Sequence, residues 1–150
     1  MAARKSSAAK PSVEATTLYM IASVHHGLRA RIEAGLKELE LTPIQYTVLS
    51  IIDHHPGLSS AALARRFYVS PQNMGQVLTA LEQRGLLTRT ENPENRRLLN
   101  VTLTAAGKAL QAQGAERMQA VERELLKGLP DESIAAFRGT LATLRSTLRD

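Results

Sequence analysis

The chain has 150 residues, a formal net charge of +5 and a pI near 10.0, a basic balance that is typical of proteins that bind nucleic acid. It contains no cysteine, which excludes disulfides, thiolate metal ligands, cysteine catalysis and cysteine-based redox sensing, and its 3% of aromatic residues predicts an aliphatic, mainly helical core. No apolar run is long enough to span a bilayer and no secretory signal is visible, so the sequence predicts a cytoplasmic protein.

Residues 1–12 are small and basic, and we interpret them as a flexible arm. From residue 13 to about 39, apolar side chains recur near helical spacing and predict a long amphipathic helix, whose apolar face is Leu18, Ile21, Leu28, Ile32 and Leu39. Thr42 and Pro43 then provide an N-cap and a first-turn proline for a second helix. Its buried face is expected to be Ile44, Val48, Leu49 and Ile52.

Two further helices follow in close succession. Ser59 caps a short third helix, with Leu63 and Phe67 pointing inward. Ser70 caps a fourth helix, which is expected to run to Arg84 and to end at Gly85 in a left-handed conformation. The inward face of this fourth helix is expected to be Met74, Val77, Leu78 and Leu81.

The rest of the chain predicts a hairpin and two more helices. Residues 86–90 and 96–103 are short strands around a turn at residues 92–95. Thr104 caps a long helix with an apolar face of Leu110, Met118, Val121 and Leu125. The last helix carries apolar residues at alternating spacings of three and four, typical of a helix that packs on another helix: Ile134, Phe137, Leu141, Leu144 and Leu148. The fold class is therefore mainly α with a small β-wing, and residues 43–103 form a winged helix-turn-helix.

The second helix of a helix-turn-helix enters the major groove, with its N-terminal residues near the base edges. Ser70 starts that helix here, and its face opposite the core carries Gln72, Asn73, Gln76 and Thr79. Asn and Gln can form bidentate contacts with adenine in the major groove. The alternative is a polar helix face in water, although such a face would usually carry more Lys and Glu.

Five arginines surround this helix. Arg65 and Arg66 end the preceding helix, which would cross the phosphate backbone, where contacts give affinity and position. Arg96 and Arg97 stand at the wing tip and would enter a narrow, negative A·T-rich minor groove. Arg89, on the first strand, would support the wing or touch phosphate.

These motifs together resemble the MarR family of transcriptional regulators, over residues 13 to 148. The matching segments are "LTPIQYTVL", "LSSAALARRFYVSPQNMGQVLTALEQRGLLTR" and "NPENRRLLNVTLTAAG". The resemblance implies a homodimer in which residues 13–42 and 104–150 are the dimerisation helices and residues 43–103 are the DNA-binding lobe. It also implies a near-palindromic double-stranded DNA site and, in many members, a small-molecule pocket whose occupancy lowers DNA affinity.

The chain departs from the family pattern at three positions. Asn95 stands where the wing usually has Asp, so the ion pair that would orient Arg97 is replaced at most by a weaker neutral hydrogen bond. Glu40 stands where Gly is usual, so this helix end is not expected to be left-handed. Ala62 occupies the position of a Glu, which leaves the capping box with Ser59 incomplete.

The resemblance places an effector pocket among the first, second and fifth helices. Its candidate residues are His25, His26, Arg29, Tyr46 and His54, and a phenolic or aromatic carboxylate is the common effector of the family. The pairs "HH" at residues 25–26 and 54–55 raise zinc as an alternative, but neighbours on a helix diverge by about 100° and no ligand spacing supports a metal.

The sequence thus predicts a sequence-specific DNA-binding transcriptional regulator, a homodimeric repressor released by an effector. The alternative is a winged-helix protein-interaction or architectural module with little sequence specificity. No set of nucleophile, base and orienting residue stands out, so we expect no enzymatic activity and no cofactor.

Overall fold

The computed structural model describes residues 13, 16–93, 95 and 99–148. The arm at residues 1–12 and the wing-tip Arg96 and Arg97 lie outside the described residues. The elements follow in the predicted order: α1 (Thr17–Leu36), the short 3₁₀ helix η2 (Lys37–Leu39), α2 (Pro43–His54), α3 (Ser60–Arg66), α4 (Pro71–Gln83), β1 (Leu87–Glu91), β2 (Leu99–Leu103), α5 (Ala105–Leu126) and α6 (Asp131–Thr147).

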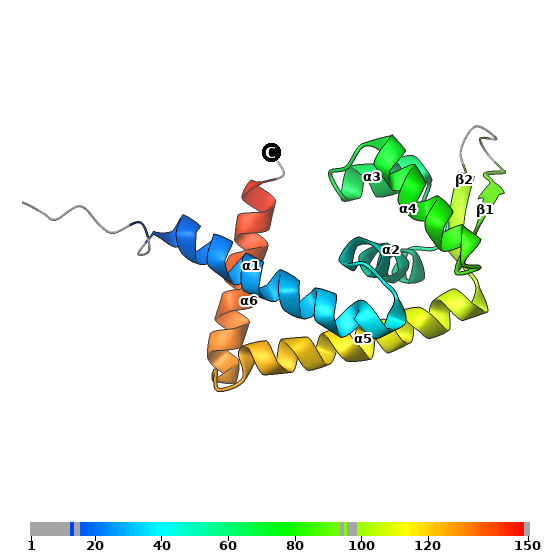
Figure 1. Ribbon diagram of the computed structural model, residues 1–150. Helices are drawn as coiled ribbons and strands as arrows, with labels where there is room; N and C mark the ends of the chain where they lie inside the picture. The colour runs from blue at the N-terminus through cyan, green and yellow to red at the C-terminus, as the bar shows by residue number, and fades with distance from the viewer. Residues whose placement is uncertain (1–12, 14–15, 94, 96–98, 149–150) are drawn as a thin grey trace, which may run out of the picture.

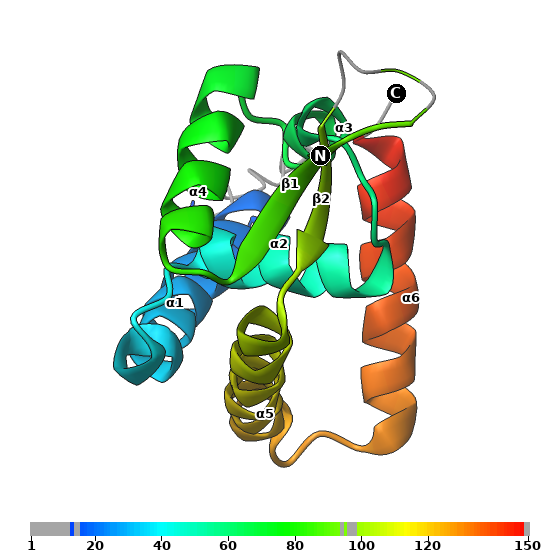
Figure 2. The ribbon, with the colours of Figure 1, turned by 90° about the vertical axis from the view of Figure 1, so that its right-hand side faces the viewer.

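The long helices α1 and α5 lie side by side, and a lobe of α2, α3, α4 and the hairpin sits over one end of α5 (Figure 1). Helix α2 connects the two parts, because it packs against α1, α4, α5 and β2. Helix α6 stands apart from the lobe in Figure 1, and Figure 2 shows α4 and the hairpin above the end of α5. Within the described residues, α6 makes no extensive contact with any other element. The prediction of a mainly helical fold with a small β-wing is confirmed.

Side chains at the predicted positions cap the helices. Thr42 Oγ1 accepts from Gln45 N at 3.3 Å, and Gln45 Oε1 accepts in return from Thr42 N at 3.0 Å, which completes a capping box. Ser59 accepts from Ala62 N at 3.2 Å, but alanine cannot return the bond, as expected. Thr104 caps α5 by accepting from Gly107 N at 3.0 Å.

Several helix ends turn through a left-handed residue, among them Glu40, Tyr68 and Gly85. The first of these corrects an expectation, because Glu40 was not expected to be left-handed and has φ 52°. Two backbone bonds hold it there: Glu40 N donates to Lys37 O at 3.0 Å and Leu41 N donates to Leu36 O at 3.4 Å. This pattern of bonds is the Schellman motif, which requires a left-handed residue whatever its side chain.

The core lies within the lobe and at its junction with α1 and α5. The predicted inward residues of α2, α3 and α4 occupy it: Val48, Leu49, Ile52, Leu63, Met74, Leu78 and Leu81 are all at most 1% exposed. Leu36 of α1 and Val101 of β2 complete it at 0%. Of the remaining predicted inward residues, Ile44, Phe67 and Val77 are half-buried against this core.

Strands β1 and β2 pair antiparallel, from Leu87 opposite Leu103 to Glu91 opposite Leu99. The segment before α3 runs along the other edge of β2, where Gly57 N donates to Val101 O at 3.1 Å and Val101 N donates to Leu58 O at 3.0 Å. The hairpin is therefore attached to the helix-turn-helix at its base.

Helix α5 lies very close to α2 at Gly114. A Cβ at this position would lie 2.6 Å from Cδ2 of the Tyr46 ring. Glycine thus allows α2 to lie directly against α5, where the tyrosine ring covers the α5 backbone.

Candidate nucleic-acid interface and effector pocket

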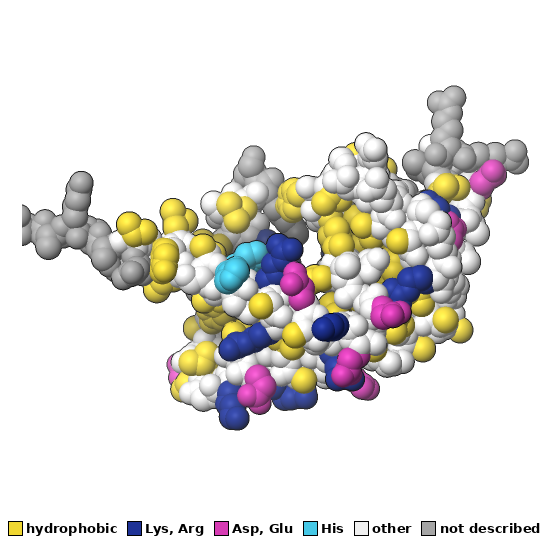
Figure 3. Space-filling view, in the orientation of Figure 1, with side chains coloured by type: hydrophobic (Ala, Val, Ile, Leu, Met, Phe, Trp, Pro, Cys, Tyr) yellow, Lys and Arg dark blue, Asp and Glu magenta, His cyan; other side chains and the backbone are white. Residues whose placement is uncertain are grey.

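The best candidate for reading DNA is α4. Ser70 Oγ accepts from Asn73 N at 3.1 Å and Pro71 forms the first turn, so the helix begins where the sequence predicts. Because Met74 and Leu78 are fully buried, the opposite side of the helix faces solvent. Gln72, Asn73 and Gln76 are exposed on that side. The surface over α4 carries few charged side chains, whereas charges gather along α5 (Figure 3).

Thr79, the fourth predicted reading residue, differs from the other three because it is half-buried and bonded within the lobe. It accepts a hydrogen bond from Arg89 Nη2 at 3.2 Å. Arg89 also forms an ion pair with Glu82, in which Arg89 Nε lies 2.9 Å from Glu82 Oε2. The hydrogen bond from Arg89 holds the pKa of the Glu82 carboxyl below its ordinary value. Arg89 therefore ties β1 to α4, which is the supporting role that the sequence left open.

The turn between α3 and α4 presents further polar and charged groups. Arg65 and Arg66 are both exposed on the last turn of α3, as predicted. Tyr68 follows them, with φ 52° and a relative exposure of 77%. Sequence reasoning passed over this tyrosine, although a bulky residue at a helix end, where glycine is common, was a visible signal.

The other end of α4 carries a second residue that sequence reasoning missed. The Arg84 guanidinium donates to the carbonyl oxygens of Glu40 at 2.7 Å and Leu39 at 3.2 Å. This residue lies 44 positions from Glu40 in the chain, and no local pattern could have paired them.

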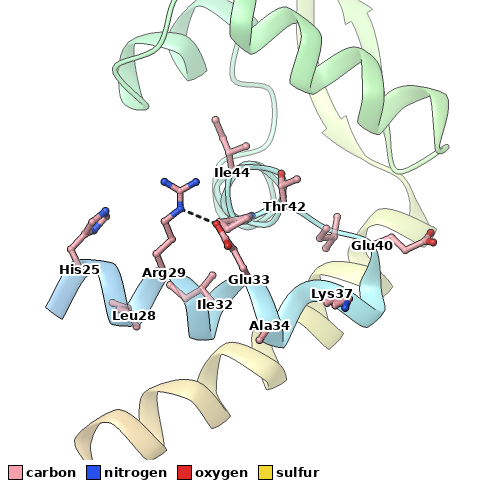
Figure 4. Close-up of a pocket in the computed structure, with 12 residues that line it drawn as sticks. His25, Leu28, Arg29, Ile32, Glu33, Ala34, Lys37, Glu40, Thr42 and Ile44 are labelled. Carbon is pink, nitrogen blue, oxygen red and sulfur yellow. Dashed lines mark hydrogen bonds and ion pairs between the residues drawn. The ribbon is translucent and has the colours of Figure 1, made fainter. Parts of the chain in front are cut away.

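A cavity of about 840 Å³ lies at the junction of α1 and α2. Its lining includes two of the predicted effector residues, His25 and Arg29, together with Ile32, Glu33, Thr42 and Ile44 (Figure 4). Arg29 Nε lies 2.8 Å from Glu33 Oε1, and this ion pair raises the pKa of the Arg29 guanidinium. The cavity therefore combines apolar walls with a guanidinium among its lining groups.

A second hollow, of about 690 Å³, adjoins the first and shares His25, Ile32 and Pro43 with it. It contains Tyr46, the third predicted effector residue, and extends between α1, α5 and α6 over Val121 and Phe137. Burial raises the pKa of the Tyr46 hydroxyl.

The remaining histidines are placed elsewhere. His54 is exposed at the end of α2, where its Nδ1 lies 2.7 Å from Ser50 O, and neither it nor His26 lines either hollow. In the part of the chain that the structure describes, no three His, Cys, Asp or Glu side chains come together as metal ligands. Among the described helices, none combines the length and the apolar character that crossing a bilayer demands.

Comparisons with known proteins agree on one family. The MarR family model matches residues 39–98. The HTH-type transcriptional repressor Rv2887 of Mycobacterium tuberculosis is 35% identical over 128 residues, which span 85% of this chain and 92% of that protein. A crystal structure of the MarR family protein Rv2887 in complex with salicylic acid superposes with a TM-score of 0.71 at 34% identity, over 89% of this chain and 99% of that one. The transcriptional repressor CouR, bound to a 23-mer DNA duplex, superposes with a TM-score of 0.83 at 27% identity, over 91% of this chain and 98% of that one.

Proposed function

The chain belongs to the MarR family, and from this membership we propose that it is a homodimeric DNA-binding repressor whose affinity for its operator is lowered by an aromatic carboxylate. The predicted family and the predicted class, a ligand-responsive DNA-binding regulator, are confirmed. The family is one of transcriptional regulators rather than enzymes. A cytoplasmic location accords with this role.

The observation that carries the proposal is the solvent-facing side of α4. It presents Gln72, Asn73 and Gln76, three uncharged amides without a structural partner among the described residues, beside the exposed Arg65 and Arg66. Amide side chains can read base edges, while arginines contact phosphate. A sequence-reading helix flanked by phosphate contacts is the arrangement that a specific DNA-binding protein needs.

We assign the two parts of the protomer to two tasks. Residues 43–103 form the DNA-binding lobe, and residues 13–42 and 104–150 form the dimerisation region. Large apolar side chains of α1 and α6 support this division, because they are exposed in the protomer: Leu18, Tyr19, Met20, Ile21, Val24, Phe137, Leu141, Leu144 and Leu148. A soluble protein rarely leaves such a surface uncovered.

Fluorescence anisotropy tests the DNA-binding role. The DNA upstream of this protein's own gene is compared with a scrambled fragment at two salt concentrations. We expect tight, salt-sensitive binding that prefers the upstream fragment, and Arg66→Ala should reduce the slope of log affinity against log salt by about 0.9 for each phosphate that the variant no longer neutralises. Weak binding that is equal for the two fragments would favour the architectural alternative.

The effector site that we propose is the cavity at the α1–α2 junction, with Arg29 as the group that binds the carboxylate. Salicylate, which occupies the related Rv2887 protein, combines a carboxylate with an apolar ring, and the cavity offers a guanidinium and the apolar Ile32 and Ile44. Because Glu33 already pairs with Arg29, the ligand carboxylate has to displace the Glu33 carboxylate. A ligand bound in this cavity lies between α1 and the DNA-binding lobe. It can therefore change the spacing between the two lobes of a dimer, so that they no longer match successive major grooves, which lie about 34 Å apart.

Removing the Glu33 carboxylate, which competes with the ligand for Arg29, should strengthen effector binding. We expect Glu33→Gln to tighten salicylate binding several-fold, since Arg29 is then free, and Arg29→Met to weaken it, because the guanidinium that binds the carboxylate is removed. Isothermal titration calorimetry measures both effects. Glu38→Gln is the matched control, because Glu38 pairs with Arg117 and does not line the cavity. The same change in salicylate affinity in all three variants would contradict this assignment.

A further inference from the structure

Tyr68 occupies a backbone position that favours glycine. Its N–H donates to Arg65 O at 3.3 Å, and the N–H of Val69 donates to Ala64 O at 3.2 Å. These are the two bonds of a Schellman motif that ends α3, with Tyr68 as its left-handed residue at φ 52°. At the end of α4, the equivalent position is Gly85, with φ 69°.

The fold itself does not explain a tyrosine at this position. A bulky side chain in the left-handed region carries strain that glycine avoids. Burial does not offset this strain, because Tyr68 is 77% exposed, and its hydroxyl makes no hydrogen bond to the described residues. Strained residues of this kind cluster at functional sites.

The position of Tyr68 suggests what the side chain contacts. It lies in the turn of the helix-turn-helix, two residues after Arg66 and two residues before Ser70, the cap of α4. In this motif the first helix crosses the DNA backbone and the second enters the groove, so the turn between them faces the strand at the groove edge. Tyrosine hydroxyls are among the groups that contact DNA phosphates.

We propose that Tyr68 is a DNA-contacting residue whose hydroxyl donates a hydrogen bond to a backbone phosphate at the edge of the major groove. This inference rests on the DNA-binding role proposed above. The contact positions the N-terminus of α4 in the groove and does not itself read a base.

Loss of a phosphate contact made by an uncharged group changes DNA affinity in a way that differs from loss of a base contact or of an arginine contact. Removing it weakens binding to all sequences by the same factor, because every DNA has phosphates. Removing it also leaves the salt dependence unchanged, because an uncharged phenol releases no counterion, whereas removing an arginine contact lowers the slope. Tyr68 and Arg66 can thus be distinguished in one assay.

The test compares Tyr68→Phe and Tyr68→Asn with wild-type protein by anisotropy, on the upstream and scrambled fragments and across a salt series. Phenylalanine keeps the ring and removes only the hydroxyl, while asparagine tolerates the left-handed conformation and removes the ring. We expect Tyr68→Phe to weaken binding about 3- to 10-fold for each lobe, hence roughly 10- to 100-fold in a dimer, on both fragments and with the wild-type salt slope. Tyr68→Asn should weaken binding at least as much.

Controls separate this effect from folding. The Tm of Tyr68→Asn should not fall below that of wild type, since the substitution relieves strain. Tyr68→Phe keeps the ring and the backbone conformation and removes only an exposed hydroxyl, so its Tm should equal that of wild type.

The assay distinguishes failure of the proposed DNA-binding function from failure of the Tyr68 phosphate contact. If wild-type protein binds no DNA, the proposed function fails and this inference fails with it. If wild type binds and Tyr68→Phe binds as tightly, or if the weakening is confined to one fragment or changes the salt slope, the DNA-binding role stands and the phosphate contact by Tyr68 is wrong.

Discussion

At the level of single residues, charged and uncharged side chains behave differently at the two candidate sites. Arg89 is held by Glu82 and Thr79, and Arg29 is held by Glu33. The amides of Gln72 and Gln76 face solvent instead. An exposed amide retains its hydrogen-bonding capacity for a ligand, whereas a paired arginine has to break an existing bond first. The bases are therefore read, in our proposal, by the uncharged residues.

Replacing one of these amides should reduce discrimination between sequences. We expect Gln76→Ala to lower affinity for the preferred fragment by about 1–3 kcal/mol per half-site, the usual worth of a bidentate base contact, with little change on scrambled DNA. Gln83→Ala, at the far end of α4, is the matched control and should change neither affinity. If Gln76→Ala weakens binding to both fragments equally, base reading by Gln76 is excluded.

The Arg89–Glu82 pair should make stability depend on pH. Because the folded-state pKa of Glu82 lies below its ordinary value of 4.5, its contribution to stability is present above pH 4.5 and is lost as the pH falls below it. We expect wild type to be more stable than Glu82→Gln at pH 6–8 and the difference to close between about pH 4.5 and the folded-state pKa. Urea unfolding at a series of pH values measures this. A difference that is constant across the series would show that the ion pair does not stabilise the fold.

At the level of elements, α4 is held at both ends and along its length. Ser70 caps its first turn, Arg89 joins it to β1, and Arg84 bonds its last turn to the carbonyls of Leu39 and Glu40 after η2. The reading helix is therefore attached to the end of the α1 segment that lines the proposed effector cavity. Through these hydrogen bonds, a shift of α1 relative to the lobe is transmitted directly to α4.

The close approach of α2 to α5 gives a stability prediction. Gly114→Ala places a methyl group 2.6 Å from the Tyr46 ring, so that the ring or one of the two helices has to move. We expect a decrease of about 1–3 kcal/mol in unfolding free energy, the usual cost of overpacking, measured by urea unfolding. Gly75→Ala is the control: nothing lies within 4 Å of the added carbon, and helix propensity should increase stability by about 0.5–1 kcal/mol. Equal effects of the two substitutions would mean that the contact between Tyr46 and Gly114 is not tight in solution.

At the level of the whole molecule, the protomer is incomplete by itself. Leu18 of α1 is 80% exposed, and Leu141 and Leu144 of α6 are 46% and 43% exposed. The hollow between α1, α5 and α6 is lined by the same kind of side chain. A second copy of the chain can cover these surfaces, and two lobes can then read the two halves of a near-palindromic site.

A charge on the apolar face of α6 should therefore separate the dimer. We expect Leu144→Glu to give a monomer by light scattering and to abolish tight DNA binding, because each lobe alone contacts half a site. Ser146→Glu introduces the same charge two residues away, roughly 200° around the helix, and should leave the dimer intact. A Leu144→Glu protein that remains dimeric would remove this face of α6 from the interface.

Much of the lobe could be predicted from sequence because its signals are local. Thr42, Ser59, Ser70 and Thr104 cap their helices through bonds to residues three positions away, and Gly85 ends α4 as predicted. Helical periodicity similarly identified the buried face and the exposed amide face of α4. Such features depend on the order of neighbouring residues, and the chain alone is sufficient for them.

Other features depend on packing between distant segments. Arg84 reaches Glu40 across 44 residues, the Arg89 side chain turns to α4, and His54 lies outside the hollows that contain His25 and Tyr46. The left-handed conformation of Glu40 also depends on such packing. Glycine is the residue that usually adopts this conformation, but the backbone hydrogen bonds at the end of η2 impose it on Glu40. The sequence therefore predicted which residues form the reading helix, whereas the packing of the lobe against α1 and α5 sets which side chains remain free to bind.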